Sequence, residues 1–152
     1  MNPQAAQNYL RTRVLTATPE QLQMMLYDGA IRFADAARTA IINQDWEGTY
    51  KNCSRAQKII TELSSSLKHD ISPDLCSKLA ALYNYIFRKL IDASLHHTVE
   101  SVDEALKMLR YQRETWGLVM EKLGKEKAAT AASKIDIPPS NSKMEAMLSV
   151  QA

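Results

Sequence analysis

The apolar residues of this chain recur at the three- and four-residue spacing of amphipathic α-helices. Helix starts are indicated where a capping side chain precedes an apolar-periodic run, at Thr18-Pro19, Asp45, Ser72-Pro73 and Thr98. We therefore expect four long helices, from Pro19 to about Ile42, from Asp45 to near Leu67, from Pro73 to about His96, and from Thr98 to a C′ position at Gly124. Because the links are short, the expected fold is all-α, an antiparallel up-down four-helix bundle over residues 18–124.

Two further segments flank the expected bundle. Residues 1–17 carry Tyr9, Leu10, Val14 and Leu15 and are expected to form an N-terminal arm or a short helix. Residues 125–152 change to a composition rich in Lys, Glu, Ala and Ser, followed by Pro138-Pro139, which cannot support a packed core. We expect a mostly disordered, flexible tail, in which the helical spacing of Met144, Met147 and Leu148 predicts a short helix over 141–149 on binding.

The helix expected over 19–42 carries more apolar surface than one face of a bundle needs. Its core stripe consists of Leu22, Leu26, Gly29, Phe33, Ala37 and Ala40. A second apolar group, centred roughly 150° away around the helix, consists of Met24, Tyr27, Ile31 and Ala34. The helix over 73–96 repeats the feature, because Tyr83, Phe87 and Ile91 extend to one side of its core stripe.

The other two long helices each carry a single stripe that we expect to be plain core. On the second helix this stripe contains Trp46, Tyr50, Cys53, Ile60, Leu63 and Leu67, and on the fourth it contains Val102, Leu106, Leu109, Trp116, Met120 and Leu123. Three outcomes are open for the surplus stripes: they widen the core, they are covered by the N-terminal segment, or they receive an amphipathic helix of another protein. The last two are compatible, because an arm that covers an empty groove can move when the groove is filled.

Composition and charge narrow the classes of function. Nineteen Lys and Arg against seventeen Asp and Glu give a net charge of +2 without a long like-charge block, so no nucleic-acid partner is expected. The longest apolar run, Leu79–Tyr83, is far too short for membrane insertion, and a cytoplasmic location is expected. Cys53 and Cys76 are expected to be reduced core thiols.

The sequence contains no recognisable motif for catalysis, a cofactor or a metal ion. Its histidines lack the Glu-x-x-His or His-x-x-x-His spacing of metal sites in bundles, and its four glycines are isolated and form no phosphate loop. We therefore expect that the protein is not an enzyme. The enzymatic alternative is a histidine phosphotransfer bundle that uses His96 or His97, and only the architecture and this pair of histidines favour it.

The run from Tyr9 to Phe33, YLRTRVLTATPEQLQMMLYDGAIRF, closely resembles the opening of the flagellin export chaperones of the FliS family. Family-like features continue in runs 55–63, 82–86 and 109–116, so that the resemblance covers about residues 8–123. It implies a four-helix bundle that binds the disordered C-terminal segment of flagellin, prevents premature polymerisation and helps delivery to the flagellar export gate. It also implies that the N-terminal segment lies over part of the empty flagellin-binding surface, and Tyr9 through Val14 match that motif.

The stripes and the resemblance together give an expected partner-binding set. The set lines a hydrophobic groove and consists of Tyr9, Val14, Met24, Tyr27, Ile31, Ala34, Tyr83 and Phe87. The same stripes could instead pair two copies of this chain in a weak homodimer, or serve a generic helical adapter, and both alternatives stay open at this point.

Overall fold

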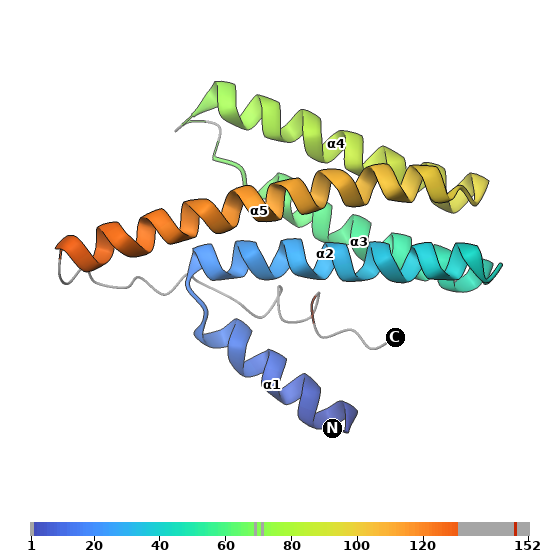
Figure 1. Cartoon of the computed structure of the whole chain (residues 1–152), viewed down its shortest axis with the longest axis horizontal. Coiled ribbons are helices and arrows are strands. Elements are labelled where there is room, and N and C mark those ends of the chain that lie inside the picture. The colour runs from blue at the N-terminus through green and yellow to red at the C-terminus, as the bar shows by residue number, and fades with distance from the viewer. Residues whose placement is uncertain (1, 69, 71, 131–147, 149–152) are drawn as a thin grey trace. The chain divides into compact units, whose positions relative to one another are not determined.

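The computed structural model of the chain describes residues 2–68, 70, 72–130 and 148. Within these residues the secondary structure consists of five α-helices, and no strand occurs (Figure 1). The helices are α1 (Pro3–Thr16), α2 (Pro19–Ile42), α3 (Trp46–Ser65), α4 (Pro73–His96) and α5 (Val99–Thr130). The expected all-α class is confirmed, and the segment expected as an arm contains a helix of its own.

The start of α2 is fixed by hydrogen bonds between Thr18 and Gln21. The backbone N–H of Gln21 donates to Thr18 Oγ1 at 3.2 Å, and the backbone N–H of Thr18 donates to Gln21 Oε1 at 3.0 Å. This reciprocal pair is a capping box, and Pro19 occupies the first helical position, where a backbone N–H would have no helical partner. The helix start expected from the sequence is therefore confirmed.

The turn between α2 and α3 takes three residues, and its last residue caps α3. Gln44 adopts a left-handed backbone conformation with φ 56°, and Asp45 Oδ1 then accepts a hydrogen bond from the backbone N–H of Gly48 at 3.0 Å. A Cβ atom at position 48 would collide with the Asp45 carboxylate. The cap thus depends both on Asp45 and on the missing side chain at Gly48.

The end of α5 differs from the expectation, because the helix continues through Gly124 to Thr130. Residues 125–129, with the sequence Lys-Glu-Lys-Ala-Ala, are strong helix formers, and together they outweigh the cost of one glycine, about 1 kcal/mol. Lys125 Nζ also lies 3.5 Å from Glu121 Oε1, one turn earlier. The expectation of disorder from residue 125 is therefore wrong for residues 125–130. The short helix expected over 141–149 lies outside the described residues, apart from the buried Leu148.

The chain divides into two compact units, residues 27–112 and residues 1–26 with 113–152, and each is described by itself. In the unit of residues 27–112, segments of α2, α3, α4 and α5 form the antiparallel bundle (Figure 1). Its core includes Phe33, Ala37, Ile59, Ile60, Leu63, Ile86, Leu90, Val102, Leu106 and Leu109, all buried. The links between these helices are short, as the sequence predicted.

The other unit contains α1, the first turns of α2 and the last part of α5. Trp116 Nε1 donates a hydrogen bond to the backbone carbonyl of Glu20 at 2.9 Å. The next residue, Gly117, packs beside the Met24 side chain. A Cβ atom added at position 117 would lie 3.6 Å from Met24 Cε. These contacts join the second half of α5 to the beginning of α2.

The stripe expected to be core on α3 is only partly buried. Cys53, Ile60 and Leu63 are buried as expected, whereas Trp46 is 43% exposed and Tyr50 is 66% exposed. The Trp46 indole stacks on the His97 imidazole, with ring centroids 3.9 Å apart and ring planes 9° apart. The expectation for Trp46 and Tyr50 was wrong because Thr49, Cys53 and Ala56 form the buried face at the start of α3, and Trp46 and Tyr50 lie to one side of it. Trp46 packs on the corner between α4 and α5 instead.

Two glycines in helices should respond in opposite ways to alanine substitution. We expect Gly124→Ala to increase the free energy of unfolding by about 0.5–1 kcal/mol, because nothing lies within 4 Å of the added Cβ and alanine favours a helix. We expect Gly48→Ala to decrease it by about 1 kcal/mol, because the Cβ displaces the Asp45 cap. Urea unfolding followed by circular dichroism measures both, and a destabilising Gly124→Ala would contradict the helical assignment at that position.

The buried thiol of Cys53 should make stability depend on pH in the alkaline range. Cys53 and Cys76 are free and buried, as expected, and burial raises the pKa of Cys53 from 9.0 to about 11. Between these values the unfolded chain releases the proton and the folded chain keeps it. The free energy of unfolding therefore falls as pH rises, by at most about 3 kcal/mol from this group.

The substitution Cys53→Ala should remove this contribution. We expect the stability difference between the wild type and Cys53→Ala to shrink from pH 8 to pH 11 in urea titrations. A difference that stays constant over this range would contradict the raised pKa.

Candidate functional site

The residues predicted to bind a partner on α2 and α4 differ in exposure. Tyr27 is 2% exposed, and Ala34 and Tyr83 are fully buried. Met24 and Ile31 on α2, and Phe87 on α4, are half-buried. The expectation that the whole set forms surface beyond the needs of the core is therefore wrong for Tyr27, Ala34 and Tyr83, although the set's role in partner binding stays a prediction.

A direct hydrogen bond explains why Tyr27 and Tyr83 can be core residues. Their hydroxyl oxygens lie 2.6 Å apart in the interior and join α2 to α4. A buried tyrosine contributes a large apolar ring but requires a partner for its hydroxyl, and each of these residues provides one for the other. The first outcome considered for the surplus stripes, a wider core, therefore holds at this level of the bundle.

Half-buried apolar side chains follow the tyrosine pair by one turn on both helices. Ile31 is four residues after Tyr27, and Phe87 is four residues after Tyr83. The two helices run in the same direction (Figure 1), so Ile31 and Phe87 lie at the same level along the bundle. They provide partly accessible apolar area above a fixed core, which is the kind of surface that an amphipathic segment can contact.

Two ion pairs hold α2 against α5 and so help to fix the orientation of α2. Arg38 Nε lies 2.6 Å from Asp103 Oδ1, and Arg110 Nη2 lies 2.9 and 3.1 Å from the two carboxylate oxygens of Asp35. The hydrogen bond to Asp103 raises the pKa of Arg38 above its ordinary value. About half of each of the four side chains is exposed to solvent, which screens the charges, so the pairs add little to stability and their main effect is on orientation.

The α1 residues of the predicted set also differ in exposure. Tyr9 is 62% exposed. The guanidinium carbon of Arg13 lies 5.9 Å from the centroid of the Tyr9 ring. Val14, five residues later and on the opposite side of the helix, is fully buried. Asn2 caps the helix by accepting a hydrogen bond from the backbone N–H of Ala5 at 2.7 Å. The aromatic ring of Tyr9 is thus accessible on an ordered helix.

The histidines of the phosphotransfer alternative both have partners within the chain. His96 Nδ1 lies 3.0 Å from Asp92 Oδ1 at the end of α4, and His97 is stacked on Trp46 as described above. His97 is also the C-cap of α4, with φ 55°, so neither histidine lies in the middle of a helix. This geometry gives the phosphotransfer alternative no support beyond the architecture.

Two further observations concern ligands and membranes. Within the described part of the chain, no group of three or more His, Cys, Asp or Glu side chains is placed to hold a metal ion. Among the helices of that same part, none combines the length and the apolar content needed to cross a bilayer.

Sequence comparison then identifies the family. The family model described as "Flagellar protein FliS" matches residues 1–123. The chain belongs to the FliS family. The resemblance carried by Tyr9–Phe33 is therefore confirmed, and FliS proteins are a family of flagellar secretion chaperones and not of enzymes.

Individual FliS proteins are similar to most of this chain. This chain is 35% identical over 115 residues to the flagellar secretion chaperone FliS of Bacillus subtilis (strain 168). The match covers 76% of this chain and 84% of the relative. It is 30% identical over 112 residues to the flagellar secretion chaperone FliS of Escherichia coli (strain K12). That match covers 73% of this chain and 82% of the relative.

A solved structure supports the fold of this FliS-family chain. The structure titled "Crystal structure of flagellar chaperone from bacteria" matches with a TM-score of 0.64 and 20% identity, over 78% of this chain and 97% of that one. At this identity the likeness concerns the fold, and it agrees with the all-α bundle described above.

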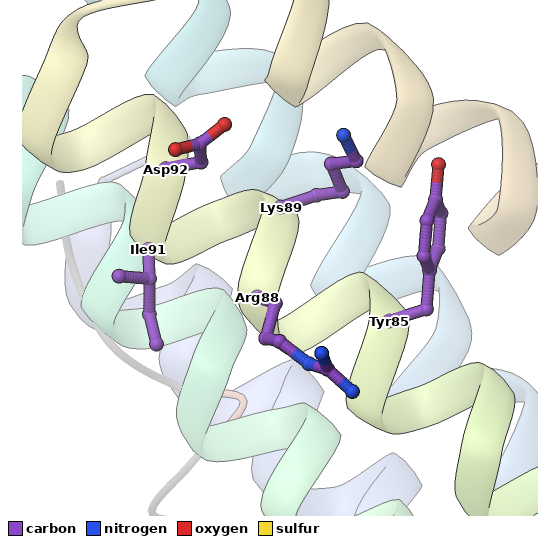
Figure 2. A pocket seen from close by; sticks show the side chains of 5 residues that line it. All are labelled: Tyr85, Arg88, Lys89, Ile91 and Asp92. Carbon is purple, nitrogen blue, oxygen red and sulfur yellow. The ribbon is translucent and has the colours of Figure 1, made fainter.

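One surface feature of this FliS-family chain does not follow from its sequence pattern. A cavity lies along α4 and is lined by Tyr85, Arg88, Lys89, Ile91 and Asp92 (Figure 2). The apolar periodicity includes Ile91 but assigns no role to the charged residues around it. An available signal was the interruption of this charged face by Tyr85 and Leu95, both large and exposed.

The hydrogen bond between Tyr27 and Tyr83 should be measurable as a coupling energy. We expect Tyr27→Phe and Tyr83→Phe each to lower the free energy of unfolding by about 1–2 kcal/mol, because each removes the shared bond in the interior. The double variant should lose clearly less than the sum. Urea unfolding of the wild type, the two single variants and the double variant measures the coupling energy. Tyr111→Phe, at an exposed tyrosine, is the control. Strictly additive losses of stability would contradict the coupling.

Proposed function

We propose that this protein is a cytoplasmic chaperone that binds the disordered C-terminal segment of flagellin. By covering the segment it prevents premature polymerisation, and it aids delivery of flagellin to the flagellar export gate. Membership of the FliS family, from the match over residues 1–123, carries this proposal. The structural support is the partly accessible apolar area at Ile31 and Phe87.

The physical requirement for such a chaperone is a rigid, preformed binding surface. Folding of a disordered segment on a partner typically costs about 2–5 kcal/mol in ordering, so a partner that also had to become ordered would bind weakly. Here the buried tyrosine pair fixes α2 against α4, and the exposed ion pairs orient α2 against α5. The surface around Ile31 and Phe87 is therefore held in place before any ligand arrives.

We place α1 in the same mechanism. Its Tyr9 is exposed and its Val14 is buried, a combination suited to a segment that covers apolar surface with one side and offers an aromatic ring with the other. In the proposed cycle the N-terminal segment lies over part of the flagellin-binding surface when that surface is empty and moves away when flagellin binds.

Binding to a flagellin C-terminal peptide tests the proposal directly. Calorimetric titration should give a one-to-one complex with a dissociation constant well below ten micromolar, and circular dichroism should show helix induced in the peptide. Stoichiometric protein should also slow the polymerisation of purified flagellin. The absence of binding at ten micromolar would contradict the proposed function.

Two variants locate the site on the bundle. Ile31→Glu should weaken peptide binding at least tenfold, because it places a charge in half-buried apolar surface, while its far-ultraviolet spectrum stays helical. Leu118→Glu, on a residue that is 64% exposed on α5, is the matched control and should bind as the wild type does. Equal affinities for the two variants would contradict the assignment of the site. Tyr27 is unsuitable for such a test, because its side chain is in the core.

A further inference from the structure

One buried apolar residue lies beyond the five helices. Leu148 is 3% exposed, although residues 131–147 separate it from the end of α5. It belongs to the compact unit that also contains α1, the first turns of α2 and the second half of α5. A leucine is covered to this extent only where other side chains surround it, so the chain at residue 148 packs within this unit.

The same unit has apolar side chains that its helices leave partly accessible. On α5, Trp116, Met120 and Leu123 recur at helical spacing in the expected core stripe, yet each of them is only half-buried. Met24, in the first turns of α2, is half-buried as well. The unit therefore offers apolar area to a further side chain, and Leu148 is of the kind that covers such area.

Leu148 also lies outside the part of the chain that the family shares. The match to the FliS family model ends at residue 123. Position 148 is therefore no part of the shared body, and the family fold does not require the burial of Leu148. A contact that the fold does not require can be released without loss of the bundle.

Covalent attachment makes Leu148 an effective ligand, although a single side chain binds weakly. A group on the same chain acts at an effective concentration on the order of millimolar, because its binding step is intramolecular. The contact therefore persists while the surface is empty and is lost to a ligand that covers a larger area. The apparent affinity of that ligand is reduced in proportion to the fraction of molecules whose surface is free.

We propose that Leu148 is an intramolecular competitor of flagellin. It covers apolar surface of its unit while no partner is bound, and it leaves when the C-terminal segment of flagellin binds there. The inference rests on the proposed function and adds a regulatory contact to the same site, since Tyr9, Val14 and Met24 of the expected partner-binding set belong to this unit. Because a ligand must displace Leu148, apolar segments that bind more weakly than flagellin are prevented from binding.

The affinity of a variant without this leucine tests the proposal. Leu148→Asp should bind the flagellin C-terminal peptide at least threefold more tightly than the wild type in calorimetric titrations, because a charged side chain does not stay in apolar surroundings. Leu118→Asp makes the same change at a 64% exposed leucine of the same unit and should stay within twofold of the wild type. Unchanged or weaker binding by Leu148→Asp would overturn the proposal.

Circular dichroism separates competition from a purely structural role. Leu148→Asp should keep the helical spectrum of the wild type, because the shared body of the family does not include position 148. Loss of the helical spectrum would overturn the proposal, because it would make Leu148 a core residue that the fold needs.

Limited proteolysis measures the release of Leu148 without flagellin. Trypsin cleaves after Lys143, five residues before Leu148, and mass spectrometry quantifies the fragment 144–152. Cleavage of a transiently released segment follows the population of the released state. The fragment should therefore form at least threefold faster from Leu148→Asp than from the wild type, whereas Leu118→Asp should match the wild type. Equal rates for Leu148→Asp and the wild type would show that Leu148 holds nothing in place and would overturn the proposal.

Flagellin should release Leu148, because the coupling between two competing ligands is reciprocal. A saturating amount of the flagellin C-terminal peptide should raise the rate of cleavage after Lys143 in the wild type to that of Leu148→Asp. An unchanged rate with bound peptide would overturn the proposal and leave the proposed function intact. Absence of peptide binding by both the wild type and Leu148→Asp would instead contradict the proposed function, and the competition with it.

Discussion

The hydrogen bond between Tyr27 and Tyr83 sets the relation between α2 and α4 in the bundle. Apolar packing alone tolerates small shifts of one helix along another, whereas a buried hydroxyl that moves away from its partner loses a hydrogen bond in a medium of low dielectric constant. The bond therefore defines the register of the two helices. The levels of Ile31 and Phe87, one turn farther along, are set by the same bond.

The sequence was sufficient to predict the helices wherever local chemistry determines their ends. Thr18, Pro19 and Gln21 form a complete start signal, and Asp45 with Gly48 forms another, so these starts could be predicted closely. The end of α5 could not be located in this way. A glycine is compatible both with a helix terminus and with a helix interior, and the choice at Gly124 depends on the summed propensity of the residues that follow.

The site could be predicted less completely, because periodicity counts the apolar positions of one helix and does not show what faces them. Periodicity assigns Tyr27 and Tyr83 to surplus stripes, yet their hydroxyls hydrogen-bond to each other inside the core. Trp46 shows the opposite error, since it is in phase with the core stripe of α3 and yet stacks on His97, at the end of α4. Contacts of this kind depend on how distant helices meet.

The stack of Trp46 on His97 has a mechanical consequence for the bundle of residues 27–112. The α2–α3 hairpin and the α4–α5 hairpin are joined covalently through residues 66–72, at one end of the bundle. The aromatic stack connects the two hairpins at the other end, where the backbone provides no link between them. A pair of hairpins tied at a single end could open like a hinge, and the stack opposes that opening together with the packing of the core.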